Sequence, residues 1–156
     1  MIDDGELGRA LKTLTVIWGS MLVSVLIYIF AIPRYVGENI NALLPPEAYQ
    51  MLRPALYIIS VGLILGARFA SKYILSGKTN LQNTRAAANP ALQRYTTAMI
   101  IALGMSEAVA IFGLGLFIVA RDTVSLYFLG AVSILSMLMY RPSRDDIVEA
   151  AKNQEL

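Results

Sequence analysis

Glu107 is the residue whose type and position point most directly to chemistry. It is the only charged residue in the run from Thr96 to Ala120. At about 1.5 Å per residue, a helix of this length can cross a hydrocarbon core of about 30 Å. An ionised carboxyl near the middle of such a helix is costly, by several kcal/mol. We therefore expect Glu107 to face protein or water, to be paired, or to be protonated.

The composition indicates a membrane protein with one domain over residues 1–156. Hydrophobic residues make up 56% of the chain and charged residues 15%, which is more apolar than a soluble domain normally is. The chain has no cysteine and no histidine, which excludes disulfides, haem ligation and the usual zinc sites. The net charge of +2 is too small to indicate nucleic acid. We expect no metal and no cofactor.

Four apolar runs predict an all-α membrane protein with four transmembrane helices. The predicted spans are 13–32, 55–75, 96–120 and 123–140. Pro33 follows the first span and Pro54 opens the second. Residues 143–156 are expected to form a short tail, with Ser143 as a helix N-cap. An interfacial loop before Pro54, with a short helix from Pro46, and a polar connection over 76–95 complete the chain.

The basic residues predict the orientation of these spans. Nine lie near the two termini and the second connection, and three lie on the opposite side: Arg9, Lys12, Lys72, Lys78, Arg85, Arg94, Arg141, Arg144 and Lys152 against Arg34, Arg53 and Arg121. Because positively charged segments stay in the cytoplasm, both termini are expected to be cytoplasmic. The predicted location is the cytoplasmic (inner) membrane, as a multi-pass protein.

Arg68 is the candidate partner of Glu107. It lies about 10 Å above the cytoplasmic end of the second span, and Glu107 lies about 17 Å above the start of the third. An extended arginine can cover that difference, so one hypothesis is an intramembrane ion pair that keeps Glu107 ionised. The competing hypothesis is that Arg68 extends to the lipid headgroups and Glu107 stays protonated.

Small residues on the second and third spans predict a close helix hairpin. Gly62, Gly66 and Ala70 recur every four residues and so share one helix face. Gly104 and Ala108 offer matching small residues on the third span. Such stripes let two membrane helices approach closely, and packing is their simplest role. Ser133 and Ser136 are expected to bond backbone or a neighbouring helix.

The run from Ser106 to Leu114, SEAVAIFGL, carries a resemblance to a known family. It resembles the outer helix of rotary ATPase c subunits (the proteolipid family), in which the ion-carrying carboxyl sits in a similar E-A-x-x-I-[YF]-G-L context. Thr96-Thr97 and the small residues of the helix before the polar connection add to it, so the resemblance covers Ala55 to Ala120. It implies that Glu107 carries a proton or cation and that Ser106 is a neighbouring ligand.

The sequence thus predicts a small subunit of a larger membrane complex, in which Glu107 is a protonatable or an ion-pairing site. Its expected partners are the lipid bilayer and either other membrane subunits or copies of itself. The alternative is a stand-alone homo-oligomeric small transporter or channel. An enzyme is not expected, because the sequence shows no nucleophile–base pair, no phosphate loop and no carboxylate pair within a span.

Overall fold

Helices make up nearly all of the structure, a computed structural model that describes residues 4–36, 43–76 and 90–152. In chain order they are α1 (Asp4–Leu26), the π-helical segment η1 (Ile27–Ala31), α2 (Ile32–Val36), α3 (Pro46–Leu75), α4 (Pro90–Ala120), α5 (Thr123–Met139) and α6 (Arg144–Lys152). Within these described residues, three stretches are long and apolar enough to cross a membrane: Leu7–Val36, Pro46–Leu75 and Ala91–Ala120. The prediction of an all-α, multi-pass membrane protein is confirmed at this level.

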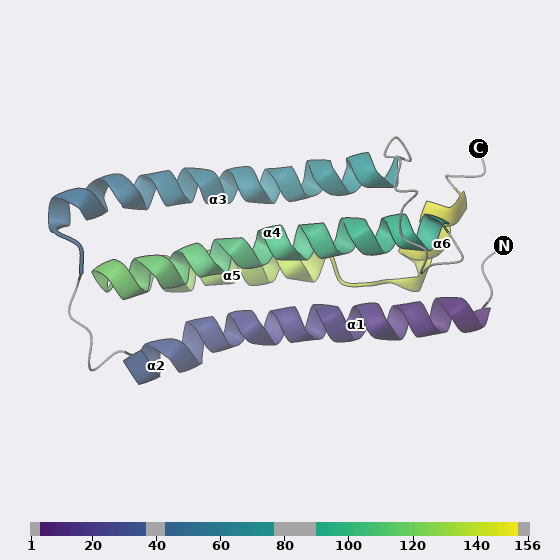
Figure 1. Cartoon of the computed structure of the whole chain (residues 1–156), viewed down its shortest axis with the longest axis horizontal. Helices are drawn as coiled ribbons and strands as arrows, with labels where there is room; N and C mark the ends of the chain where they lie inside the picture. The colour runs from purple at the N-terminus through teal and green to yellow at the C-terminus, as the bar shows by residue number, and fades with distance from the viewer. Residues whose placement is uncertain (1–3, 37–42, 77–89, 153–156) are drawn as a thin grey trace.

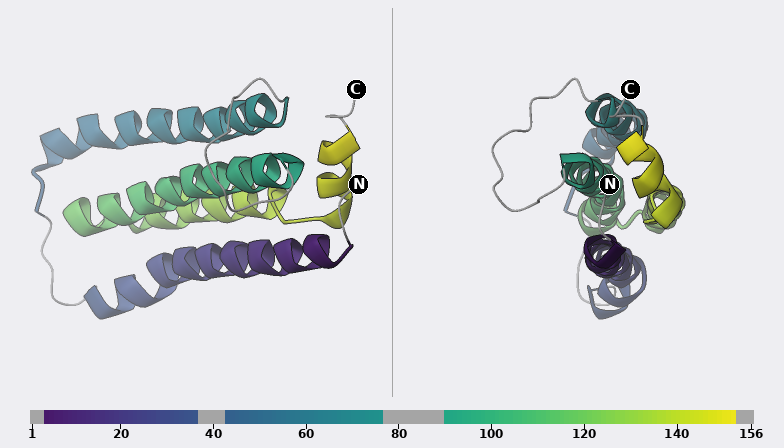
Figure 2. Two further views of the ribbon diagram at one scale, coloured as in Figure 1. Left: turned by 45° about the vertical axis from the view of Figure 1, so that its right-hand side comes forward. Right: turned by 90° about the vertical axis from the view of Figure 1, so that its right-hand side faces the viewer.

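The long helices run side by side along one axis (Figure 1). The end-on view shows α4 and α5 between α1 on one side and α3 on the other (Figure 2). α1 and α4 run in the same direction, and α3 and α5 run in the opposite one (Figure 1). The start of α1 and α6 lie at the same end of the bundle (Figure 1). α5 is apolar but has 17 residues, which is about 25 Å of helix.

The first three long helices begin before the starts of the predicted spans, α1 at Asp4. α3 begins at Pro46, and Pro54 lies inside it, so the prediction that Pro54 opens the second helix is wrong. Proline removes one hydrogen bond and weakens a helix. The start of α3 is nevertheless held from outside, because the backbone N–H groups of Leu43 and Leu44, just before the helix, donate to the carbonyl of Val119 at the end of α4 (2.9 and 3.0 Å). α4 likewise begins at Pro90, before Thr96.

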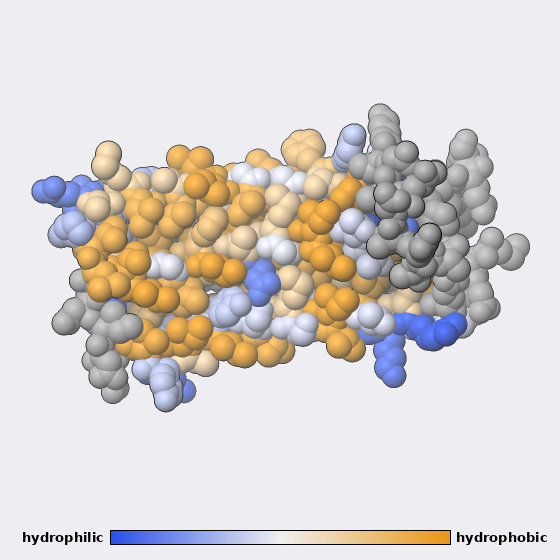
Figure 3. Space-filling view, in the orientation of Figure 1, coloured by the Kyte–Doolittle hydropathy of each residue, from blue (hydrophilic) through white to orange (hydrophobic). Residues whose placement is uncertain are grey.

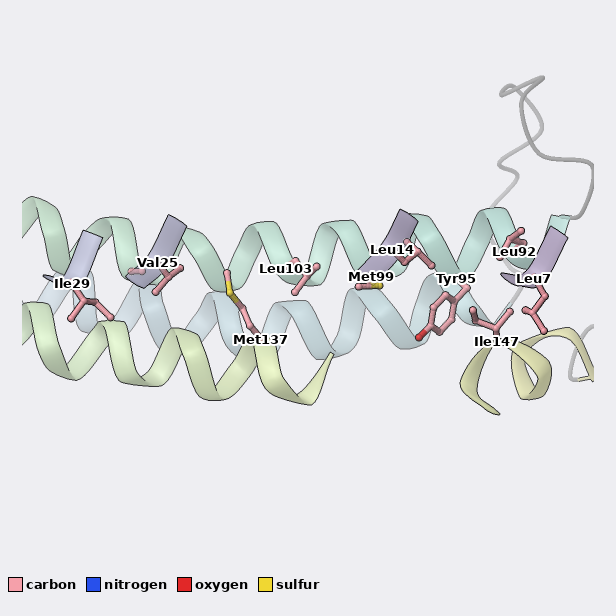
Figure 4. Packing of buried hydrophobic residues seen from close by; sticks show 11 residues of the cluster. Leu7, Leu14, Val25, Ile29, Leu92, Tyr95, Met99, Leu103, Met137 and Ile147 are labelled. Carbon is pink, nitrogen blue, oxygen red and sulfur yellow. The ribbon is translucent and has the colours of Figure 1, made fainter. Parts of the chain in front are cut away.

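The main hydrophobic cluster joins α1 to α4, α5 and α6. Figure 4 shows it running along the bundle, from Ile29 and Val25 near one end to Leu7 and Ile147 near the other. Ile147 is fully buried, which fixes α6 across the end of the bundle. Ser143 caps α6, as predicted, by accepting from the backbone N–H of Asp145 (3.3 Å).

A second cluster joins α3 to the middle layer. Its fully or nearly fully buried members are Val109, Leu116 and Leu129, from α4 and α5, and side chains of α3 such as Leu56 and Leu63 pack against them. α3 therefore packs along α4, as the hairpin prediction requires, and reaches α5 as well. The two clusters place α1 and α3 on opposite sides of α4, which decides where the polar groups of α4 can find partners.

Candidate functional site

Glu107 lies near the middle of α4 and contacts α1. Its Oε1 accepts a hydrogen bond from the Ser24 hydroxyl at 2.5 Å and another from the Tyr28 hydroxyl at 3.2 Å. Ser24 and Tyr28 are four residues apart, so successive turns of one helix face present both hydroxyls to the same oxygen. The site therefore consists of one carboxyl from α4 and two hydroxyls from the opposing helix.

The helix that carries these hydroxyls changes its winding at the site. Tyr28 lies in η1, where the chain forms a π-helix, and the backbone N–H of Ile32 donates to the carbonyl of Ile27, five residues back. π-Helical turns are rare and often occur at functional sites. Ile29 is buried there against Gly130 of α5, at which a Cβ would lie 2.6 Å from Ile29 Cγ1. Gly130 thus allows α5 to approach η1 closely and supports the turn that carries Tyr28.

The Glu107 carboxyl is only partly buried. One turn before it, Gly104 is exposed, and nothing lies within 4 Å of the place where a Cβ would stand. Figure 3 shows a small hydrophilic patch halfway along an otherwise hydrophobic face, over α4 and α1, the helices that bring the carboxyl and the Ser24 hydroxyl together. The seam between these helices therefore leaves the Glu107 side chain partly exposed.

The structure does not bring Arg68 and Glu107 together. Between side chains that the structure describes, the only ion pair joins Arg53 and Asp122. Arg68 is exposed on α3 and lines a groove of about 220 Å³ towards α5, with Ser136 and Tyr140 among its other walls. Glu107 bonds to α1, on the other side of α4. The hypothesis of an Arg68–Glu107 ion pair is therefore wrong in this structure.

Ser106 is used for packing between α4 and α5. Its hydroxyl bonds to the carbonyl of Ala102 (2.8 Å) and to the hydroxyl of Ser136 (2.7 Å), and the Ser133 hydroxyl donates to the Ser106 carbonyl (2.7 Å). All three serines are buried. Consecutive residues of an α-helix point about 100° apart, so Ser106 faces α5 while Glu107 faces α1. The expectation that Ser133 and Ser136 bond a neighbouring helix is confirmed.

The predicted small-residue stripes contribute unevenly to packing. At Gly66, a Cβ would lie 2.9 Å from the tip of the Met105 side chain. Gly62 and Gly104 are exposed, and a Cβ at either position would have no neighbouring atom within 4 Å. Ala70 and Ala108 are partly buried. The close backbone approach of α4 is made by Gly113 instead, where a Cβ would lie 3.2 Å from the Ser125 carbonyl oxygen of α5.

A second polar cluster surrounds Asp122 in the turn between α4 and α5. The carboxylate caps α5 by accepting from the Ser125 backbone N–H (3.0 Å), and it accepts short hydrogen bonds from the hydroxyls of Ser125 and Tyr49. Arg53 Nε lies 3.4 Å away, and Tyr57 bonds to the Ser125 hydroxyl at 3.0 Å. This cluster ties the first two turns of α3, and the turn that includes Pro54, to the opposite hairpin.

The Asp122 carboxyl is held in its ionised form. Burial alone would raise its pKa, but the hydrogen bonds from Ser125 and Tyr49, together with the charge of Arg53, outweigh burial and bring the pKa below its ordinary value. Because three hydrogen bonds and the Arg53 guanidinium satisfy the carboxylate, whose side chain is 8% exposed, we interpret the cluster as a structural clamp. Glu107, in contrast, has two hydroxyl partners, and no described cationic side chain forms an ion pair with it.

Sequence reasoning missed Ser24 and Tyr28 as partners of Glu107. Tyr28 lies near the end of the first predicted span, where a tyrosine commonly anchors at the membrane interface, so its position alone did not indicate a bond to Glu107. The available signal was the i, i+4 pair of hydroxyl groups inside an uncharged run. Comparisons with models of protein families, with curated protein sequences and with solved structures gave no match to this chain.

Proposed function

We propose that this chain is a small multi-pass subunit of a larger membrane complex, in which Glu107 takes up and releases a proton. The observation that supports this most is the pair of acceptors around the Ser24 hydroxyl. Ser24 Oγ lies 2.7 Å from the carbonyl oxygen of Met21 and 2.5 Å from Glu107 Oε1. A hydroxyl has one proton and can donate to only one of them at a time.

Both protonation states of Glu107 are accommodated by this arrangement. When Glu107 is ionised, Ser24 and Tyr28 donate to the carboxylate. When Glu107 is protonated, the Ser24 hydroxyl turns to the Met21 carbonyl, and its oxygen accepts the proton of the carboxylic acid. No side chain has to move by more than a hydroxyl rotation, so a proton can come and go without an uncompensated buried group.

No cationic side chain that the structure describes forms an ion pair with Glu107, and this supports the same proposal. An arginine within ion-pair distance would hold the Glu107 carboxylate in its ionised form, as Arg53 does for Asp122. The partly exposed seam beside Gly104 gives access from outside the bundle. The resemblance of SEAVAIFGL to the outer helix of c subunits, where a carboxyl carries the ion, agrees with this reading.

The rest of the proposal concerns the setting of the site. We infer four membrane crossings with α5 as the shortest, both termini in the cytoplasm, and a location in the cytoplasmic membrane, following the distribution of lysine and arginine. The alternative, a homo-oligomeric transporter or channel, differs in its partners. Native mass spectrometry after mild solubilisation separates the two: recovery with other subunits favours the complex, and a closed ring of this chain favours the alternative.

The experiment that tests the proton site is reaction of Glu107 with a hydrophobic carbodiimide in native membranes. This reagent attacks the protonated carboxyl, so labelling should fall as the pH rises and should vanish in Glu107→Gln. Ser24→Ala removes one donor to the carboxylate and should increase labelling at a given pH, whereas Arg68→Gln should leave it unchanged. Absence of labelling at every pH would contradict the proposal.

A further inference from the structure

A groove between α3 and α5 combines one cation with an apolar wall. It has a volume of about 220 Å³, and Ile64 and Arg68, one turn apart, line it from α3. The residues that line it from α5 follow the spacing of one helix face: Val132, Leu135, Ser136, Met139 and Tyr140. We propose that this groove binds one anionic phospholipid, with the phosphate on Arg68 and part of an acyl chain between the two helices.

Arg68 carries a charge that the lining segments of α3 and α5 do not balance. No acidic side chain that the structure describes forms an ion pair with it. Residues 48–106 and 123–144, which include α5 and nearly all of α3, contain no aspartate or glutamate. Asp145 and Asp146 of α6 do not line the groove. Because an unpaired cation inside an apolar span is costly, the groove favours an anion supplied from outside this chain.

The phosphate would take its hydrogen bonds from Arg68. Ser106 donates its hydroxyl proton to the carbonyl of Ala102 (2.8 Å), so the hydrogen bond of 2.7 Å between the Ser106 and Ser136 hydroxyls uses the proton of Ser136. Ser136 therefore has no proton left to donate to a ligand. Arginine, in contrast, offers a planar fork of N–H groups that fits two phosphate oxygens.

The mouth of the groove lies near the level of the lipid headgroups. The ion pair of Arg53 and Asp122 marks the end of the bundle away from α6, and α3 and α5 run from it in the same direction (Figure 1). From that pair, Arg68 follows after about 22 Å of α3 and Tyr140 after about 27 Å of α5. In a hydrocarbon core of about 30 Å, the Arg68 side chain can therefore reach the headgroups. This level depends on the membrane crossing of α5 that we propose, and not on the proton site.

The wall below Arg68 fits an acyl chain. It is formed by Ile64 and by apolar residues of α5, among which Leu135 and Met139 are 63% and 69% exposed. A lipid satisfies the cation and covers this wall at once, whereas a soluble phosphate leaves the wall uncovered. Basic pockets between helices at the cytoplasmic surface bind lipid headgroups in this way. Phosphates are present over the whole membrane surface, whereas an acidic residue of a partner helix would have to lie at the depth of Arg68.

The test is native mass spectrometry of the full chain released from vesicles of phosphatidylglycerol and phosphatidylcholine in equal amounts. We expect retention of one phosphatidylglycerol with a preference of about fivefold over phosphatidylcholine, which corresponds to about 1 kcal/mol for one arginine. Arg68→Gln should abolish this preference, and Arg68→Lys should keep most of it. Lys72→Gln removes an exposed cation one turn further along α3 that does not line the groove, and it should leave most of the preference intact.

A second pair of variants tests the apolar wall. Leu135→Trp fills the groove and should abolish most of the phosphatidylglycerol retention. Leu138→Trp adds the same ring at another exposed position of α5, outside the groove, and should change retention little.

Several outcomes would overturn the proposal. Equal retention of the two lipids, or a loss of preference in Lys72→Gln as large as in Arg68→Gln, would show that the groove does not select the anionic headgroup. Equal effects of the two tryptophan variants would place the lipid elsewhere on α5. Displacement by glycerol 1-phosphate would show a site for a soluble phosphate. Absence of the lipid from the chain recovered with other subunits from native membranes would show that a partner helix fills the groove. If circular dichroism shows that Arg68→Gln loses helical content, the tryptophan pair decides.

Discussion

A double-mutant cycle on folding stability can decide which residue is energetically coupled to Glu107. In the structure, Ser24 bonds to the carboxyl and Arg68 does not. The cycle compares Ser24→Ala, Glu107→Ala and the double variant, with a parallel cycle in which Arg68→Ala replaces Ser24→Ala. Each cycle isolates one pairwise free energy, because the cost of the cavity left by Glu107→Ala cancels.

The expected coupling between Ser24 and Glu107 is about 1 kcal/mol. A hydrogen bond to a charged group contributes roughly 1.5–3 kcal/mol in soluble proteins, whereas measured side-chain bonds within membranes average about 0.6 kcal/mol. The Ser24 hydroxyl also has the Met21 carbonyl 2.7 Å away, so it stays satisfied when Glu107 is removed, and this lowers the value. For Arg68 and Glu107 we expect additivity within about 0.5 kcal/mol.

Unfolding of the detergent-solubilised chain by sodium dodecyl sulfate at neutral pH is the suitable assay. Trp18 is the only tryptophan, and its indole N–H donates to the Met137 carbonyl of α5 at 2.9 Å. Its fluorescence therefore reports separation of α1 from α5. Additivity for Ser24 and Glu107, combined with a coupling of 1 kcal/mol or more for Arg68 and Glu107, would refute the placement of the carboxyl against α1.

Three further predictions concern the parts of the bundle that support the site. Since the pKa of Asp122 is lowered on folding, its contribution to stability is present above about pH 4 and is lost as the pH falls through the folded pKa. The stability of Asp122→Asn, measured by the same assay, should therefore change less than that of the unmodified chain as the pH falls below about 4. Gly130→Ala should destabilise the chain by about 1–3 kcal/mol because the new Cβ meets Ile29, whereas Gly115→Ala should not, because nothing lies within 4 Å of its new Cβ. Adding Ile29→Ala to Gly130→Ala should relieve part of this cost. Equal effects of the two glycine substitutions would contradict this packing. Ser133→Ala should lower the free energy of unfolding by less than about 1.5 kcal/mol, because it removes one hydrogen bond between α4 and α5. Thermal unfolding in detergent should show a smaller loss of stability for Ser133→Ala than for Gly130→Ala.

Composition and apolar run length were sufficient to predict the helices, because a membrane helix must satisfy all of its backbone hydrogen bonds internally. Helix boundaries were harder to predict. Pro54 looked like a helix start because proline is unfavourable inside a helix, and contacts far away in sequence overrode that preference. The cluster of Asp122 with Tyr49 and Arg53 combines a turn with the first turns of α3, and no local pattern relates those two segments.

The partner of Glu107 shows what depth alone can and cannot predict. Thr13 and Thr96 begin the two predicted spans that run in the same direction, and Ser24 and Glu107 each follow eleven residues later, so their depths agree. Depth therefore favoured Ser24 over Arg68, which lies several ångströms nearer to the surface. What the sequence lacks is the rotation of each helix about its axis, which is set by packing. Here the burial of Ile29 against Gly130 orients η1, so a contact between two apolar residues determines which hydroxyl groups reach the carboxyl.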